Sequence, residues 1–254
     1  MKNNKPILVL NNIWKSFGGM MSLSDVSISV PRNRIKAVIG PNGAGKTTLF
    51  NIISGALNPN KGSIIFEGQP INGLPSHKRT FLGIGRTFQT VKLFKQMSVR
   101  ENVMVGRHCR SSSEFFSCGL RFPKSRIEEK KITERADAEL DFVGAYDMKN
   151  QVAGSLPIGL QKTVEVARAL ATDPKLILLD EPAGGLNDKE TERFSELIKK
   201  IQERGITVLL VEHDMRLVMN ISDEIAVLNY GEKIAEGAPE AIKNNKKVIE
   251  AYLG

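Results

Sequence analysis

The sequence is poor in the features that mark secreted, membrane-spanning or disulfide-bonded proteins. Among its 254 residues, no apolar run approaches the roughly 20 residues that span a bilayer. The N-terminus, MKNNKPILVLNN, lacks the long apolar segment of a signal peptide. Cys109 and Cys118 are the only cysteines, and no pattern of His or Cys ligands surrounds them. We therefore expect a soluble cytosolic chain with two reduced thiols, rather than a disulfide or a metal site.

Aromatic residues are also scarce, at 6% of the chain, although the net charge is +8 and the sequence pI is near 9.4. Such a charge permits binding to nucleic acid or to an anionic membrane face. The basic residues, however, are spread over residues 121–131, 199–204 and 243–247 and are mixed with Glu. They lack the interleaved aromatic platform that base stacking needs. We interpret the charge as a solvated basic surface, or alternatively as proximity to a membrane, and expect no nucleic-acid partner.

What the sequence does contain is a glycine-rich stretch, GPNGAGKTT, at residues 40–48. It fits the pattern G-x-x-x-x-G-K-[ST]. Glycines let several backbone N–H groups approach phosphate oxygens closely, Lys46 neutralises the β- and γ-phosphates, and the Thr47 hydroxyl reaches Mg²⁺. We therefore predict that a nucleoside triphosphate is bound by Gly40, Pro41, Asn42, Gly43, Ala44, Gly45, Lys46, Thr47 and Thr48.

The residues around this stretch have the pattern of a strand, a turn and a helix. Residues 35–39 form a short, mostly apolar run suited to a buried strand. Residues 46–54 carry apolar side chains at helical spacing, and Gly55 follows where a helix would end. Because first-turn N–H groups have no partners within their helix, such a junction is an anion site. A turn that matches the pattern by chance is the alternative interpretation.

Two further apolar runs end in charged residues. Residues 176–179 predict a buried parallel strand ending at Asp180 and Glu181, and residues 206–211 predict a second one ending near His213. Acidic residues in this place fall where ligands bind in open α/β sheets. Asp180 can hold Mg²⁺ through water, and Glu181 can take a proton from an attacking water. His213 either contacts the γ-phosphate or is an ordinary strand-end histidine.

Two segments between these strands are further candidates. Gln89 lies in a polar stretch, where a neutral amide could bind a metal-bound water; an ordinary surface glutamine is the alternative. Residues 156–161, LPIGLQ, open a predicted helix with Pro and Gly. The N–H groups at such an opening could receive phosphate from another molecule.

The remaining segments predict additions to this nucleotide-binding part. Residues 7–30 and 63–66 have the pattern of antiparallel strands, with Phe17 on a turn, where it either stacks on an adenine or packs in the core. Residues 98–155 have helical spacing around a serine loop at 111–113. Residues 225–237 predict a hairpin and residues 239–253 a final helix. An aromatic cluster, interpreted as core rather than a docking surface, comprises Phe115, Phe116, Leu120 and Phe122.

These motifs, in this order, resemble the nucleotide-binding subunit of ATP-binding cassette (ABC) transporters over essentially the whole chain. Phe17 matches the adenine-stacking aromatic, residues 40–48 the Walker A loop, and Gln89 the Q-loop. Asp180 and Glu181 match the Walker B pair. The remaining matches are the D-loop at residues 184–187, the switch histidine at His213, and the signature at Leu156, Pro157, Ile158, Gly159, Leu160 and Gln161.

The resemblance implies an α/β fold: a P-loop NTPase ABC cassette with a RecA-like core, an antiparallel β-subdomain and a helical subdomain insertion. A single domain would span residues 1–254, with the core and β-subdomain in residues 1–97 and 156–254 and the helical subdomain in about 98–155. ATP and Mg²⁺ are the implied cofactors, and Phe17, Gln89 and Asp180 join the loop as nucleotide contacts. The implied catalytic residues are Lys46, Gln89, Glu181 and His213, and the implied metal-site residues are Thr47, Gln89 and Asp180.

More narrowly, GRTFQTVKLFKQMSVREN, DEPAGGLN and the tail from residue 213 onward are similar to the LivG-type ATPase of branched-chain amino acid importers. This similarity implies a peripheral protein at the cytoplasmic face of the membrane. Its partners would be two permease subunits, a second cassette and, indirectly, a substrate-binding protein. Urea or short-amide importers, soluble ABC proteins that act on nucleic acid, and P-loop kinases are the alternatives.

The signature departs from the usual L-S-G-G-Q, because only Leu156 and Gly159 match it. Pro157 has neither a hydroxyl nor an N–H group to offer a γ-phosphate. In this superfamily each Walker A loop faces the signature of the other cassette. A complete Walker A loop beside a degraded signature therefore suggests an asymmetric pair, in which a second, non-identical cassette supplies the intact signature.

Overall fold

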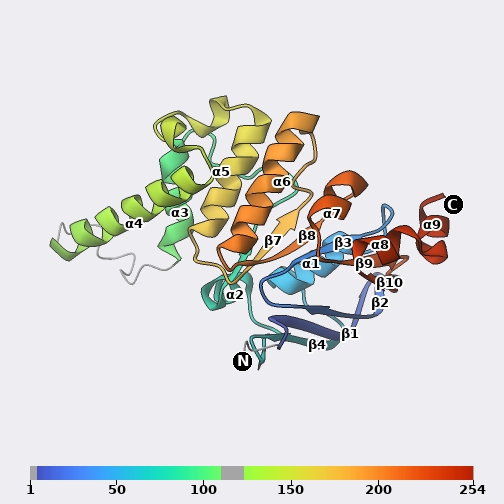
Figure 1. Ribbon diagram of the computed structural model, residues 1–254. Coiled ribbons are helices and arrows are strands. Elements are labelled where there is room, and N and C mark those ends of the chain that lie inside the picture. Colours follow the sequence, from blue (N-terminus) through green and yellow to red (C-terminus); the bar gives the residue numbers. More distant parts are fainter. Residues whose placement is uncertain (1–4, 110–122, 254) are drawn as a thin grey trace.

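The computed structural model describes residues 5–109 and 123–253 and contains two sheets (Figure 1). The first sheet is antiparallel and has the strand order β2-β1-β4-β5. Its alternating burial follows the alternation of apolar residues in the sequence. The strands are β1 (Leu8–Phe17), β2 (Met20–Val30), β4 (Lys61–Phe66) and β5 (Gln69–Pro70).

The second sheet has the order β10-β9-β3-β8-β7-β6, in which all neighbours are parallel except the edge pair β9 and β10. Every residue of β3, β7 and β8 is buried, as their continuous apolar runs predict for strands covered on both faces. The strands are β3 (Ile35–Ile39), β6 (Ile84–Arg86), β7 (Leu176–Asp180), β8 (Thr207–Val211), β9 (Glu224–Asn229) and β10 (Glu232–Gly237).

Alternate residues of this second sheet enter two different cores. On one face, Leu178 and Leu209 pack with Phe50 of helix α1 (Lys46–Ser54) and with the antiparallel sheet. On the other face, Leu179 and Leu210 pack with helices α5 (Ile158–Leu170), α6 (Asp188–Glu203) and α7 (Met215–Ile221). Helix α1 therefore lies between the two sheets, and α5 and α6 cover the opposite side (Figure 1). The predicted α/β class with a separate antiparallel sheet is confirmed.

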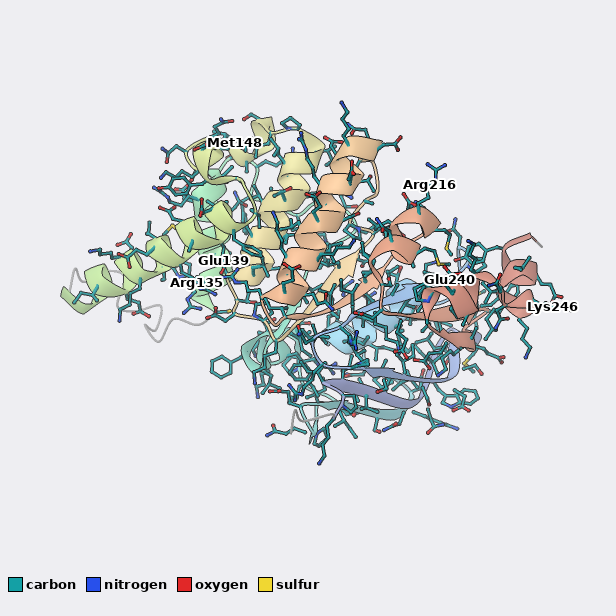
Figure 2. All side chains as sticks on the ribbon, viewed as in Figure 1. Arg135, Glu139, Met148, Arg216, Glu240 and Lys246 are labelled. Carbon is teal, nitrogen blue, oxygen red and sulfur yellow. The ribbon has the colours of Figure 1, made fainter. Side chains whose placement is uncertain are left out.

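A helical part follows β6 and the short helix α2 (Ser76–Leu82). It contains α3 (Val99–His108), α4 (Pro123–Phe142) and the 3₁₀ turns Tyr146–Met148 and Ala153–Ser155, with its own apolar cluster against α5. Arg135 and Glu139 on α4 lie on the side that faces α6 (Figure 2). Arg204 at the end of α6 donates to Glu139 from Nη1 and Nη2, at 2.6 and 2.9 Å. Cys118, the serine loop and the aromatic cluster of residues 115–122 lie outside the described residues.

The predicted single final helix over residues 239–253 is wrong, because two helices occupy this stretch. They are α8 (Pro239–Lys243) and α9 (Lys246–Leu253). The Asn245 side chain accepts hydrogen bonds from the N–H groups of Lys247 and Val248, at 3.0 and 3.4 Å, and so begins a new helix. Within residues 5–109 and 123–253, no helix is both long and apolar enough to cross a bilayer.

Candidate nucleotide-binding site

The order of the parallel strands brings the predicted site residues to one edge of the sheet. Strands β3, β8, β7 and β6 are parallel neighbours, so their carboxyl ends meet at one edge of the sheet. The glycine-rich loop follows β3, Glu181 follows β7, His213 comes shortly after β8, and Gln89 shortly after β6. Four segments far apart in the sequence thus open onto one site.

The glycine-rich loop needs glycine at its two fixed positions for steric reasons. Gly40 has φ +152°, and a Cβ there would lie 2.1 Å from the carbonyl oxygen of Leu228. Gly45 has φ +100°, and its Cβ would lie 2.6 Å from the carbonyl oxygen of Ser22. Both values are far below any real contact between a Cβ and backbone. The loop is therefore packed tightly against β9 and β2, which fixes the position from which helix α1 begins.

Lys46 is buried at the start of α1 and points back over the loop. Its Nζ donates hydrogen bonds to the carbonyl oxygens of Gly40 and Pro41, at 2.6 and 2.9 Å. Burial lowers the pKa of the Lys46 ammonium, and the negative charge of Glu181 opposes that shift. The loop lysine and the acidic end of β7 therefore act on the same space, as the triphosphate prediction requires.

Three of the predicted catalytic side chains meet around one carboxylate oxygen. Gln89 Nε2 donates to Glu181 Oε2 at 2.9 Å, and His213 Nδ1 lies 3.9 Å from the same oxygen. The Glu181 backbone is held separately, since its N–H donates to the carbonyl of Val211 and its C=O accepts from Lys162 Nζ. Glu181 has φ +46°, an uncommon value for a residue other than glycine. The anchored backbone holds this carboxylate toward the loop, Gln89 and His213.

Asp180 lies deeper than Glu181 and is paired with an arginine. Its side chain is 3% exposed, and Arg86 Nη2 donates to Oδ2 at 3.0 Å. Burial raises the pKa of the Asp180 carboxyl, and the hydrogen bond and charge of Arg86 oppose this. Arg86 also donates to the Asn51 and Ser54 side chains of α1. It thereby ties the strand that precedes Gln89 to both α1 and β7.

Sequence reasoning did not assign roles to Arg86, Lys162 or Glu212. Glu212 is fully buried and accepts hydrogen bonds from the N–H groups of Ala183 and His213, at 2.7 and 3.0 Å. It therefore joins the segment after Glu181 to the segment that carries His213. Its place between an apolar strand and His213 was the only local signal for it. No local signal marks Arg86, whose partner is 94 residues away.

Within the described part of the chain, neither Phe17 nor residues 156–161 form a hydrogen bond or ion pair with Gln89, Glu181 or His213. Phe17 ends β1 and is 47% exposed, while β2 returns from that turn to place Ser22 Oγ 2.8 Å from Thr48 Oγ1. Residues 156–161 open α5, where Ile158 is 47% exposed. A Cβ on Gly159 would meet the Glu190 carboxylate, and Gln161 donates to the Leu156 carbonyl at 2.7 Å. This helix opening presents backbone and apolar groups.

Comparison with known proteins places these features in a family. A family model described as ABC transporter matches residues 23–184, and one described as branched-chain amino acid ATP-binding cassette transporter matches residues 232–254. The high-affinity branched-chain amino acid transport ATP-binding protein BraF of Pseudomonas aeruginosa is 43% identical over 252 residues, 99% of both chains. The corresponding protein LivG of Escherichia coli is 42% identical over the same shares.

A solved structure agrees with these relatives. The ADP conformation of an ATP-binding cassette of an ABC transporter superposes with a TM-score of 0.86 at 36% identity, covering 98% of this chain and 99% of that one. The glycine-rich loop, the acidic strand end and the order of the strands thus occur here in a chain that matches such cassettes from end to end. The chain belongs to the ABC transporter family of ATPases, in the branch that contains LivG and BraF.

Proposed function

We propose that this chain hydrolyses ATP to drive the import of branched-chain amino acids through two permease subunits at the cytoplasmic face of the membrane. ATP hydrolysis is supported chiefly by one observation: Gln89, Glu181 and His213 lie together beside the loop that contains Lys46. The names of BraF and LivG, with their full-length similarity, support the choice of substrate. A substrate-binding protein would deliver the amino acid to the permeases.

The residues present fit Mg²⁺–ATP. The tightly packed glycines leave backbone N–H groups free to face phosphates, Lys46 supplies the positive charge, and Phe17 offers a half-exposed ring for the adenine. Mg²⁺ in such sites takes one or two protein ligands and completes its shell with phosphate oxygens and water. Thr47 would bind it directly, Gln89 and Asp180 would hold it through water, and it would supply neutralisation of the developing phosphate charge.

In the proposed reaction, Glu181 accepts a proton from the attacking water as the oxygen of that water approaches the γ-phosphate. Gln89 binds one oxygen of the Glu181 carboxylate and so orients the other. His213 is well exposed, at 61% of its side chain, and can reach a phosphate that enters from solvent. Lys46 and the signature of a second cassette would stabilise the charge that develops on the transferred phosphoryl group.

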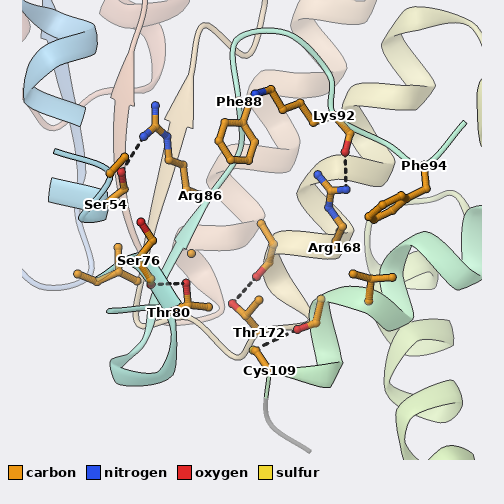
Figure 3. Close-up of a pocket in the computed structure, with 16 residues that line it drawn as sticks. Ser54, Ser76, Thr80, Arg86, Phe88, Lys92, Phe94, Cys109, Arg168 and Thr172 are labelled. Carbon is orange, nitrogen blue, oxygen red and sulfur yellow. Dashed lines mark hydrogen bonds between the residues drawn. The ribbon is translucent and has the colours of Figure 1, made fainter. Parts of the chain in front are cut away.

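A groove beside Gln89 is the proposed permease site. It has a volume of about 420 Å³ and lies between α2, β6, α3 and α5. Phe88 and Phe94 are 39% and 53% exposed on its wall, and Lys92 and Arg168 are joined there by a 2.6 Å hydrogen bond (Figure 3). A permease helix in this groove would touch the residue next to Gln89 and so connect transport to hydrolysis. The predicted helical subdomain at about 98–155 would provide one side of the groove.

The second cassette is proposed to be a different protein. Pro157 precedes α5 without a side-chain capping hydrogen bond, and Ile158 presents an apolar side chain where another chain's γ-phosphate would approach. This opening is poorly suited to bind phosphate. The Lys46 site would therefore be completed by the intact signature of a non-identical partner.

The proposed role of Glu181 is tested with Glu181→Gln, whose matched control is Glu196→Gln, an exposed acid on α6. Loss of a general base lowers hydrolysis by about 10²- to 10⁴-fold. ATP binding should stay close to that of the unmodified chain, because the loop and Lys46 are unchanged. Phosphate release and the ATP dissociation constant are measured in parallel. If Glu181→Gln still turned over ATP at the unmodified rate, the proposed mechanism would be wrong.

A further inference from the structure

Strand β2 brings a hydroxyl to the nucleotide-binding site from outside the glycine-rich loop. Ser22 Oγ lies 2.8 Å from Thr48 Oγ1, which belongs to the first turn of α1. The Ser22 carbonyl is also close to the site, because it leaves no room for a Cβ on Gly45. The side chain and the backbone of one residue on β2 therefore contact the helix and the loop before it.

A β-bulge explains how Ser22 reaches α1. The consecutive residues Lys15 and Ser16 of β1 pair with Leu23 and Met21 of β2. Ser22 is therefore an extra residue on β2. In a regular strand, neighbouring side chains point to opposite faces of the sheet. Leu23 is fully buried in the apolar cluster shared with α1, so the bulge turns two consecutive side chains toward the helix that covers this sheet (Figure 1).

The turn between β9 and β10 holds β2 in this place. The Ser24 N–H donates to the Gly231 carbonyl at 2.8 Å, and the Gly231 N–H donates to the Ala44 carbonyl at 3.2 Å. The Ser22 carbonyl also packs against Gly231, where a Cβ would come within 2.7 Å of it. The position of Ser22 relative to the loop is thus fixed by backbone contacts that do not involve its hydroxyl.

A bound phosphate would order this pair of hydroxyls. A hydroxyl donates one hydrogen bond and can accept two, whereas the oxygens of an ionised phosphate only accept. Either hydroxyl of the pair can be the donor when no phosphate is present. Once Thr48 donates to a phosphate, its oxygen accepts from Ser22, so both O–H groups point the same way. Hydrogen bonds in such a chain polarise and strengthen one another.

We propose that Ser22 is a positioning residue for phosphate binding: its hydroxyl donates to Thr48 and directs the Thr48 O–H toward the bound nucleotide. The inference rests on the proposed ATPase function and adds to that site a residue outside the glycine-rich pattern. Because Ser22 acts through Thr48, we expect it to affect nucleotide binding rather than the chemical step at Glu181.

The test is Ser22→Ala, which removes the hydroxyl and keeps the backbone contacts of β2. Ser27→Ala is the matched control, since Ser27 is another half-buried serine of β2 and its hydroxyl accepts from the Asn12 N–H at 2.8 Å. Without Ser22, the Thr48 O–H is free to bond to a carbonyl of the preceding turn instead.

The dissociation constants of ADP and ATP, measured calorimetrically, should therefore rise by about two- to fivefold in Ser22→Ala. They should stay unchanged in Ser27→Ala. The KM for ATP should rise with the dissociation constants, whereas kcat at saturating ATP should keep its unmodified value.

A double-mutant cycle shows whether Ser22 acts through Thr48. Thr48→Val removes the second hydroxyl, keeps the shape of the side chain and should itself weaken binding. In that background Ser22→Ala should have little further effect, because no hydroxyl remains for Ser22 to direct. An equal loss of affinity in both backgrounds, or equal affinity of Ser22→Ala and Ser27→Ala, would overturn the inference and leave the proposed function intact. If instead the unmodified chain and Ser27→Ala bound no nucleotide, the proposed function itself would fail.

Discussion

Lys46 carries its charge in a buried place, and the surrounding oxygen atoms explain why this is tolerated. The carbonyls of Gly40 and Pro41 accept its hydrogen bonds, and Glu181 supplies an opposite charge. Burial still lowers its pKa, which shows that these partners only partly replace water. A phosphate group that reached the loop would add the negative charge that this position lacks. Nucleotide binding should therefore stabilise the fold through Lys46.

This stabilisation is measurable as a shift in melting temperature. A nucleotide at 100 times its dissociation constant should stabilise the unmodified chain by about 2.7 kcal/mol. Lys46→Met removes the charge that faces the phosphates, so ATP should no longer raise its melting temperature. Lys61→Met, at an exposed position of β4, serves as the control and should respond like the unmodified chain. An equal ATP response in Lys46→Met would show that the loop lysine does not bind the nucleotide.

Residues that carry a local pattern could be predicted, whereas those that act through distant partners could not. The loop pattern marks Lys46, and the end of an apolar run marks Asp180 and Glu181. Arg86 has a role only because β6 lies beside β7, which brings it to Asp180 and to α1. The order of strands in a sheet is set by tertiary packing rather than by any short stretch of sequence.

At the level of elements, the helical part is joined to the rest of the molecule by a group of charges. Glu139 on α4 has a fully buried side chain and binds Arg204 at the end of α6 and Arg135 on its own helix. Arg135 also binds Asp173, which precedes β7, and so does Arg107 from α3. Helices α4 and α6 thus meet at the buried Glu139 carboxylate, which makes Glu139 costly to leave unpaired, while Asp173 joins α3 to α4.

Arg204→Met should therefore lower the free energy of unfolding by about 2 to 3 kcal/mol. The loss is smaller than for a buried charge with no partner, because Arg135 still contacts Glu139. Urea unfolding measures this change in the free energy of unfolding. Arg193→Met, an exposed arginine on the same helix, should have little effect. Combining Arg204→Met with Glu139→Met should recover part of the loss, because no buried charge is then left behind. A double variant less stable than Arg204→Met would contradict this account.

The strongly patterned elements could be predicted closely, and the weakly patterned ones could not. The predicted strand at 35–39 and helix at 46–54 have the limits that the structure shows for β3 and α1. Apolar runs and a terminal glycine define such limits physically. The prediction of one helix over residues 239–253 was wrong. The apolar spacing continues past Asn245, but the Asn245 side chain caps a new helix. A local side-chain hydrogen bond outweighed the periodic pattern there.

At the scale of the whole molecule, the two segments proposed to bind ATP differ in the side chains that they offer. The loop, Glu181 and His213 lie at one edge of the sheet, while residues 156–161 open α5, where Gly159 lies against Glu190 and Leu186. The Gln161 amide already donates to the Leu156 carbonyl, and the other donors of this opening are backbone N–H groups, of which Pro157 contributes none. If the signature acts as proposed, two copies of this chain would form two sites that both lack these donors.

Restoring the usual signature should therefore allow this chain to associate with itself when ATP is present. The Glu181→Gln chain, which should retain bound ATP, is expected to remain monomeric with ATP in light-scattering measurements. Changing Pro157→Ser, Ile158→Gly and Leu160→Gln in that background restores L-S-G-G-Q, adds a hydroxyl and an N–H group, and removes the exposed Ile158 side chain. ATP should then cause self-association, and adding Lys46→Met should abolish it, because the phosphates that bridge the two chains are no longer bound. If the chain without the three signature changes dimerised equally strongly with ATP, the proposal of a non-identical partner would be wrong.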